Sequence, residues 1–207
     1  IEGLLRWHII SGDATSLDYA GRLVRFVTRP EFWDTFGYFP ELEKQYGDAA
    51  YSGHLHGHVA MLRALLMYAI LMDDDDLRQF VRNGYEFTRH FSSAEIGYFI
   101  EWTSCGPGCE TCEIADMIAL AIRLSDAGIG DYWDDVDRYV RNQFVEQQHV
   151  TGPDFTIGSF VIGGRPTHIR EKEVSGCCTG NGAQGLYYAW EAIVRADGGR
   201  ARVNLLM

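Results

Sequence analysis

Apolar residues recur at three- and four-residue spacing along most of the chain, which is the period of an amphipathic α-helix. The stripe is regular in residues 17–27, and Pro30 follows the end of that predicted helix. Residues 59–72 predict a longer, strongly apolar helix, still short of the roughly 20 residues that span a bilayer. The same spacing predicts further helices at 1–11, 77–87, 112–124, 132–147 and 181–195.

Short polar connectors join consecutive helices, so the sequence predicts a repeat of helical hairpins. Longer loops, which usually carry function, separate the hairpins at 30–53, 91–109 and 149–176. Within the last loop, residues 155–162 predict a short strand pair. The connectors are Ser11-Gly12-Asp13, Asp73 to Asp76, Gly128 to Asp131 and Asp197-Gly198-Gly199.

These features predict an all-α fold, namely part of an α/α toroid of the six-hairpin type with its long loops at one mouth. Residues 1–200 are expected to form a partial barrel, the catalytic domain, and residues 201–207 to begin the first strand of a following β-sandwich. A closed ring needs more hairpins than this sequence holds. The remainder of a longer parent chain is therefore an expected partner.

Composition narrows the classes of partner. The 207 residues hold 18 Lys and Arg against 29 Asp and Glu, a formal net charge of −11. This balance argues against nucleic acid or an anionic membrane surface as the main partner. Hydrophobic residues make up 46% of the chain, as in ordinary globular domains.

All five cysteines lie at two junctions between a loop and a helix. Grouped thiolates favour a soft metal, with zinc first. A disulfide framework and unconnected buried thiols remain open, although the number is odd and adjacent cysteines rarely bond to each other. Reduced thiols favour a cytoplasmic location, but zinc protects thiolates elsewhere too. The first group is Cys105, Cys109 and Cys112, and the second is Cys177 and Cys178.

A glutamate accompanies the first cysteine group. Glu110 lies two residues before Cys112, so both side chains can turn toward one point, whereas Glu113 is expected to face elsewhere. Glu110 and Cys112, together with Cys177 and Cys178, make a ligand set of one carboxylate oxygen and three sulfurs. Structural zinc sites favour four Cys or Cys with His, so this set indicates a zinc that takes part in chemistry.

Glu110-Thr111-Cys112, followed by Cys177-Cys178 and then an asparagine, resembles the motif pair of glycoside hydrolase family 127, the β-L-arabinofuranosidase family. The hairpins resemble the family's (α/α)6 barrel, and the ending from Val203 to Leu206 resembles its passage into a β-sandwich. The resemblance covers nearly all of this chain but only about the second half of the family's catalytic barrel.

The resemblance implies a carbohydrate substrate similar to an arabinofuranoside, and zinc bound by Glu110, Cys112, Cys177 and Cys178. It also implies that Cys177 is the nucleophile of a retaining hydrolase. Zinc would keep the thiolate deprotonated, and the thiolate would form a thioglycosyl intermediate, with cysteine in place of the usual carboxylate.

The family also has a glutamate as general acid/base upstream of this motif, across a longer loop than the one here. Glu101 is preferred for this role, because neighbouring aromatic residues can raise its pKa by desolvation, and Glu95 is the alternative. Cys105 and Cys109 are additions within this loop, and they leave the family's usual ligand set open to question.

Three histidines alternate at His54, His56 and His58, ahead of the apolar helix. In an extended chain this spacing points them the same way, which suits contact with substrate, a second metal or a purely structural role. The family uses histidines in its sugar pocket, and His54 or His56 resembles them. Other expected substrate contacts are His168, Tyr98 and Trp102, with Tyr51 as a further aromatic.

The run from Asp73 to Asp76 lacks the glycine and the distal glutamate of a calcium loop, so we expect a solvated connector. Asp76 and Asn181 are predicted to cap the helices that follow them. Two other functions remain open: a zinc-stabilised helical module that binds a glycan or a protein without catalysis, and a toroidal lyase or epimerase acting on uronic sugars. The second of these leaves the cysteines unexplained.

Overall fold

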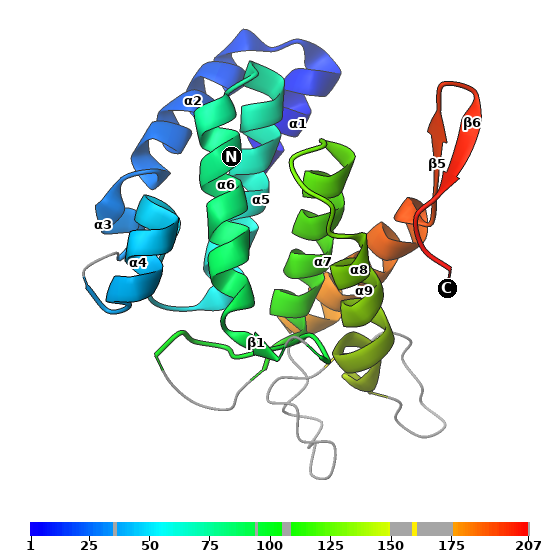
Figure 1. Cartoon of the computed structure of the whole chain (residues 1–207). Helices are drawn as coiled ribbons and strands as arrows, with labels where there is room; N and C mark the ends of the chain where they lie inside the picture. The colour runs from blue at the N-terminus through cyan, green and yellow to red at the C-terminus, as the bar shows by residue number, and fades with distance from the viewer. Residues whose placement is uncertain (35–36, 94, 105–108, 150–158, 161–175, 207) are drawn as a thin grey trace.

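The computed structural model describes residues 1–34, 37–93, 95–104, 109–149, 159–160 and 176–206. Helices dominate this part of the chain, as the apolar period predicts (Figure 1). Their bounds are α1 Glu2–Ser11, α2 Ala14–Val27, α3 Pro30–Trp33, α4 Pro40–Tyr46, α5 Leu55–Met72, α6 Asp75–Arg89, α7 Thr111–Asp126, α8 Trp133–Tyr139 and α9 Gly176–Ala192.

Successive long helices pack side by side as hairpins: α1 with α2, α5 with α6, and α7 with α8 (Figure 1). Asp13 begins α2, because its carboxylate accepts hydrogen bonds from the backbone N–H groups of Thr15 and Ser16. The predicted loop 30–53 is not all loop, since it holds α3, α4 and a 3-10 turn at Gly47–Ala49. Proline at the first position of α3 and α4 favours both helix starts.

Three short antiparallel strand pairs accompany the helices. The first two are at the long loops, and β4 lies inside the predicted strand pair 155–162. The pairs are β1 Ser92–Ser93 with β2 Tyr98–Phe99, β3 Gln148–His149 with β4 Ser159–Phe160, and β5 Val194–Asp197 with β6 Arg200–Val203.

Some predicted bounds were wrong at the ends of helices. Asp74, not Asp76, caps α6, since its carboxylate accepts from the N–H of Leu77. Helix α9 begins before Asn181, so this asparagine is a helical residue and not a cap. The helix predicted at 132–147 breaks after α8 into a π-helical turn, Val140–Phe144, in which Asn142 has non-helical backbone angles.

The predicted end of α9 was also wrong, because residues 194–197 form strand β5 instead of continuing the helix. Gly198 and Gly199 have φ of 53° and 82°, a conformation that glycine adopts without a Cβ clash, and they make the tight turn into β6. Within the described residues, β6 therefore pairs back onto β5 as a hairpin.

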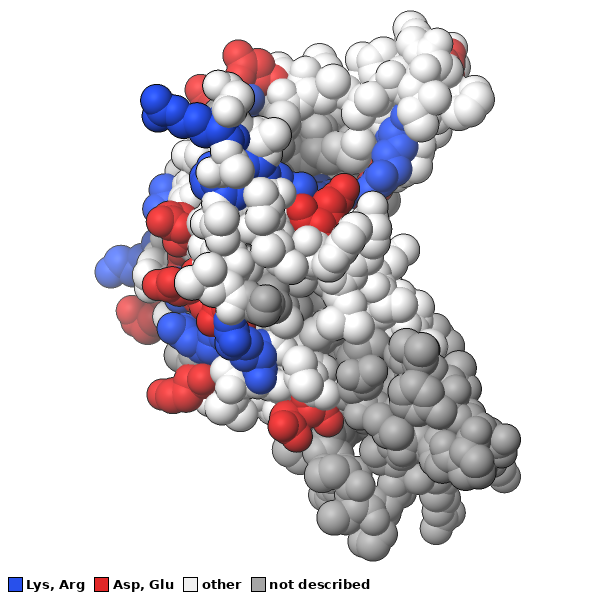
Figure 2. Space-filling view, turned by 90° about the vertical axis from the view of Figure 1, so that its right-hand side faces the viewer, with Lys and Arg blue, Asp and Glu red and all other residues white. Residues whose placement is uncertain are grey.

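Charged side chains tie this hairpin to the end of α7. Arg195 and Arg202 donate to the two carboxylate oxygens of Asp126 at 3.2 and 2.8 Å. Figure 2 shows basic and acidic side chains interleaved on the described part of this face, with uncharged surface between them. The described part of this face therefore carries charges of both signs and shows no continuous stripe of one sign.

Helix α5 is partly buried, with Ile70, Leu71 and Met72 exposed at its end, although its composition alone resembles a membrane span. Because it starts at Leu55, four residues before the predicted helix, its 18 residues are long and apolar enough to cross a bilayer. Core helices meet the same test, so a single helix of this kind is a weak indication of a membrane. Here α5 packs against both α6 and α7.

The core is centred on α7, which is buried along nearly its whole length between α5, α8 and α9. Its contact with α9 is especially close at Gly185. A Cβ at that position would lie 2.8 Å from Phe144 Cζ and 2.9 Å from Ala115 Cβ. Glycine allows this close approach in the middle of α9, where a larger side chain would clash with Phe144 and Ala115.

Replacing this glycine tests that constraint. Gly185→Ala is expected to lower the free energy of unfolding by about 1–3 kcal/mol, because the added methyl group overpacks the α7–α9 contact. Gly180→Ala on the same helix is the matched control, since a Cβ there has nothing within 4 Å. Urea unfolding of both variants measures the difference, and equal stabilities would contradict the close-packing argument.

Glu2 at the start of α1 ties that helix to α5 and α7. Its carboxylate lies 2.8 Å from Arg6, 3.1 Å from Arg123 and 3.9 Å from Arg63. Burial acts to raise the pKa of Glu2, but the hydrogen bond from Arg6 and the charges of Arg123 and Arg63 outweigh it and hold the pKa at about 2.

Because the pKa of Glu2 is depressed in the fold, its contribution to stability is present above about pH 4.5 and is lost as the pH falls toward 2. Glu2→Gln is expected to cost about 1 kcal/mol at pH 7 and to flatten the stability profile in this window. Thermal melts between pH 2 and 7 measure it. Glu41→Gln, an exposed glutamate in α4, is the control, and an unchanged profile in the Glu2 variant would refute the expectation.

Candidate metal centre

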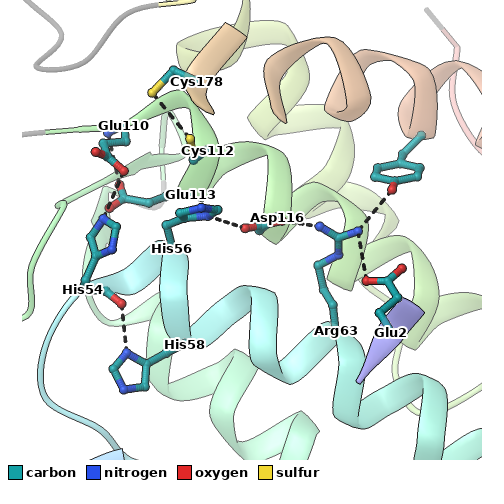
Figure 3. A network of polar contacts seen from close by, with 11 residues as sticks. Glu2, His54, His56, His58, Arg63, Glu110, Cys112, Glu113, Asp116 and Cys178 are labelled. Carbon is teal, nitrogen blue, oxygen red and sulfur yellow. Dashed lines mark hydrogen bonds and ion pairs between the residues drawn. The ribbon is translucent and has the colours of Figure 1, made fainter. Parts of the chain in front are cut away.

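The N-terminal turns of α7 and α9 bring three cysteines together. Cys112 lies in the first turn of α7, and Cys177 and Cys178 lie in the first turn of α9. Their sulfur atoms are all within 4.8 Å of one another, and the Sγ atoms of Cys112 and Cys178 are 3.5 Å apart (Figure 3). Cys112 and Cys178 are buried, whereas Cys177 is exposed.

This spacing fits a shared metal and not a disulfide. Zn–S bonds of about 2.3 Å in a tetrahedral site place sulfurs roughly 3.8 Å apart, whereas a disulfide needs about 2.05 Å. Contact with the Cys178 thiol, together with burial, raises the pKa of Cys112 well above its usual range. A bound cation would reverse that effect, and the positive ends of two helices also favour thiolates.

Cys109, the other described cysteine of the first group, is not part of this cluster. Cys109 is buried, and its sulfur accepts a hydrogen bond from Gln147 Nε2 at 3.1 Å. Burial raises the pKa of the Cys109 thiol to about 12. Cys105 lies outside the described residues.

A second group of metal-binding side chains lies beside the sulfurs, made of His54, Glu110 and Glu113. His54 Nε2 is 3.0 Å from Glu110 Oε2, and Glu113 Oε2 accepts a hydrogen bond from the Glu110 backbone N–H at 3.2 Å. This last contact is a capping-box contact that begins α7.

The expected grouping of Glu110 with the three sulfurs is not what the side chains show, since its carboxylate groups with His54 and Glu113. Glu110 is the N-cap of α7 in extended conformation, and Cys112 is already inside the helix, so the two side chains diverge. A rotation of the Glu110 side chain is needed to complete the four-ligand set.

Glu113 is not part of the sulfur cluster, in line with the expectation that it faces elsewhere. Its side chain is fully buried and turns toward Glu110 and His54 (Figure 3). Burial raises the pKa of Glu113 to about 10, and the charges of Glu110 and Glu101 act in the same direction. Its other oxygen, Oε1, has no hydrogen-bond partner among the described residues.

The three histidines do not point the same way, because α5 begins at Leu55 and coils the chain through His56 and His58. His54 turns to Glu110, His56 to Asp116, and His58 Nδ1 contacts the backbone carbonyl of His54 at 2.9 Å. His58 also stacks on Tyr51 at 4.2 Å between ring centroids. Tyr51 is buried there as a core residue, so it is not available as a sugar platform.

Asp116 is a site residue that the sequence analysis missed. It is buried, its Oδ2 lies 2.6 Å from His56 Nδ1, and it accepts a hydrogen bond from buried Arg63. Arg63 continues the network to the hydroxyl of Tyr188 at 3.2 Å (Figure 3). The signal in the sequence was the lone Arg63 inside the apolar helix α5 and an aspartate in the apolar middle of α7, which can pair with each other.

The candidate acid/base and an aromatic side chain adjoin the second group. Trp102 is 42% exposed and stacks on His54 at 5.1 Å, and its Nε1 donates to Glu101 Oε1 at 3.1 Å. The backbone carbonyl of Glu101 accepts from the N–H of Leu55, which fixes this segment against the start of α5. Glu101 is also close enough to Glu113 to affect the pKa of that carboxyl.

The remaining candidates are less well placed or lie outside the described part. Glu95 is exposed, and hydrogen bonds from its own backbone N–H and from Ser93 hold its pKa below the usual range. Tyr98 is half-buried in β2. His168 lies outside the described residues.

In comparisons with known proteins, no family model matches the chain, and no curated protein matches it significantly.

The buried pair of Asp116 and Arg63 predicts a large effect of removing one charge. Asp116→Asn is expected to lower the free energy of unfolding by about 3 kcal/mol, because Arg63 loses its main buried counter-ion. Asp126→Asn on the same helix breaks only partly exposed ion pairs and is expected to cost less than about 1 kcal/mol. Urea unfolding measures both, and equal costs would overturn the expectation.

The same variant is expected to change the titration of His56. The hydrogen bond to Asp116 raises the pKa of His56, so its stabilising contribution is present below pH 6.5 and is lost as the pH rises through the folded pKa. In Asp116→Asn the pKa of His56 is expected to fall, as followed by NMR of the imidazole ring. An unchanged value would show that the carboxylate does not set it.

Proposed function

We propose that this chain carries the zinc and nucleophile half of a retaining glycoside hydrolase similar to the β-L-arabinofuranosidases. The observation that carries the proposal is the convergence of Cys112, Cys177 and Cys178 from two helix N-termini, with their sulfurs within 4.8 Å of one another. The antiparallel helix pairs support a toroid of the (α/α)6 type as the wider architecture.

In this proposal Cys112, Cys177, Cys178 and Glu110 hold a zinc ion, which supplies the charge that keeps the thiols deprotonated at neutral pH. Cys177 is the nucleophile, because it is exposed at the start of α9 while Cys178 is buried. Its sulfur donates an electron pair to the anomeric carbon, and the glycosidic C–O bond breaks. The product of this step is a thioglycosyl intermediate.

Glu101 serves as general acid and then as general base. Its carboxyl gives a proton to the departing glycosidic oxygen, and afterwards takes one from the water that breaks the C–S bond. The hydrogen bond from Trp102 Nε1 orients this carboxyl. Glu95 is exposed and hydrogen-bonded in its charged form, which suits a general acid poorly.

The substrate contacts follow from the same segment. Trp102 offers an exposed aromatic face next to the His54 ring, a surface on which a sugar ring can stack. His56 uses Nδ1 toward Asp116, so Nε2 is the atom that can meet a sugar hydroxyl. His54, His56 and Trp102 are therefore the proposed substrate residues within the described part.

A zinc-stabilised helical module without catalysis is the second candidate. The placement of Glu110 with His54, away from the three sulfurs, favours it, because a purely structural zinc does not need the glutamate to move. It shares the metal with the first candidate but not the requirement for Glu101.

Metal content and hydrolysis of an aryl β-L-arabinofuranoside, measured on the same samples, test the proposal. The wild type is expected to hold about one zinc per chain, the content of a site with three protein sulfurs. Cys177→Ser is expected to reduce both zinc and turnover. Glu101→Gln is expected to keep its zinc but lose about 10²–10⁴ in turnover, the typical contribution of general acid–base catalysis.

Added azide identifies the acid/base residue. An anionic nucleophile needs no general base, so azide should restore turnover to Glu101→Gln. If azide instead restores Glu95→Gln, the acid/base assignment is wrong. Zinc bound by all variants, with no hydrolysis in any, would favour the non-catalytic module. Absence of zinc from the wild type would refute the thiolate site.

A further inference from the structure

We propose that His54, Glu110 and Glu113 form a second cation site, distinct from the sulfur cluster and suited to a divalent ion such as Mn²⁺ that takes oxygen and nitrogen ligands. The site goes beyond the proposed glycosidase and does not rest on it, because it uses no thiolate. The claim rests on geometry, on one buried unsatisfied atom and on the donor chemistry of the three side chains.

The geometry brings three donors from separate segments to one point. One imidazole nitrogen and one oxygen of each carboxylate lie within 4.8 Å of one another. Figure 3 shows the three side chains pointing toward a common space at the start of α7. The 3.0 Å between His54 Nε2 and Glu110 Oε2 is close to the spacing of two ligands that bind one ion at about 2.1 Å.

Glu113 gives an independent indication of a ligand. Its side chain is fully buried, one oxygen accepts from the Glu110 N–H, and Oε1 has no partner among the described residues. Buried polar atoms are nearly always satisfied, because leaving one without a partner costs free energy. A cation between Glu113 and Glu110 would satisfy this atom.

The surroundings also fix the histidine and leave a path for the ion. His54 is held by stacking on Trp102 and by the contact of its carbonyl with His58, and Nε2 faces the carboxylates. The His54 side chain is 29% exposed and that of Glu110 is 10% exposed. Solvent therefore reaches the site from the histidine side, where water can supply the remaining ligands.

The donor types separate the two sites. Carboxylates with imidazole suit Mn²⁺, whereas three thiolates select zinc, so Mn²⁺ reports on the second site alone. Glu110 lies between the groups, two residues before Cys112, and a carboxylate has two oxygens with which it can bridge neighbouring ions. In the observed conformation Glu110 belongs to the second group, and a rotation toward the sulfurs would take its carboxylate away from His54.

The test is a Mn²⁺ titration of the full chain, with loss of the free-ion EPR signal as the measure of binding. We expect one Mn²⁺ per wild-type chain. Glu113→Gln preserves the capping contact and is expected to weaken binding at least about tenfold, the lower end of losses seen for groups behind metal ligands. His54→Ala is a second variant at a half-exposed position, and it should weaken Mn²⁺ in the same way.

Two controls keep the outcomes distinct. Glu41→Gln, an exposed carboxylate in α4, and the double variant Cys177→Ser with Cys178→Ser should bind Mn²⁺ as the wild type does. Failure of the glycosidase proposal, seen as no zinc and no hydrolysis, leaves this titration unaffected. No Mn²⁺ bound by the wild type, or binding by Glu113→Gln and His54→Ala as tight as in the wild type, overturns the site.

Discussion

Helices α7 and α9 approach so closely at Gly185 that no side chain fits between them, and the rest of the site follows from this contact. This close contact fixes the position of α9 along α7, and the first turn of α9 lies beside the first turn of α7. Cys112 and Cys178 then lie 3.5 Å apart, although 65 residues separate them along the chain. Packing of two helix backbones therefore sets the spacing of the thiols.

Because α7 is buried on nearly all sides, each polar residue in it needs a partner from another helix. Asp116 finds Arg63 and His56 on α5, and this network ties the two helices together. Glu113, one turn earlier, satisfies only one of its oxygens within the described residues. Arg63 Nε in the Asp116 network and Glu113 Oε1 both lack a partner within the described residues, but only Glu113 lies beside a second carboxylate and an imidazole.

The loop-to-helix junction before α7 thus serves two kinds of chemistry. Sulfur atoms gather on the side of α9, and one imidazole with two carboxylates gathers on the side of α5. The helix start is common to both, and its positive end favours anionic ligands of either kind. A soft cation prefers the thiolates on the α9 side of this helix start, and a hard cation prefers the imidazole and carboxylates on the α5 side.

The sequence by itself determined the helical hairpins, the connectors of α1–α2, α5–α6 and α7–α8, and the two cysteine groups, because apolar period and residue type are local properties. It did not determine where α5 and α9 begin, and this decides where His56, Cys177 and Cys178 point. Burial of Glu113 and its turn toward Glu110 came only from packing across helices. A side chain's direction depends on the phase of its helix and on its neighbours, and tertiary contacts set both.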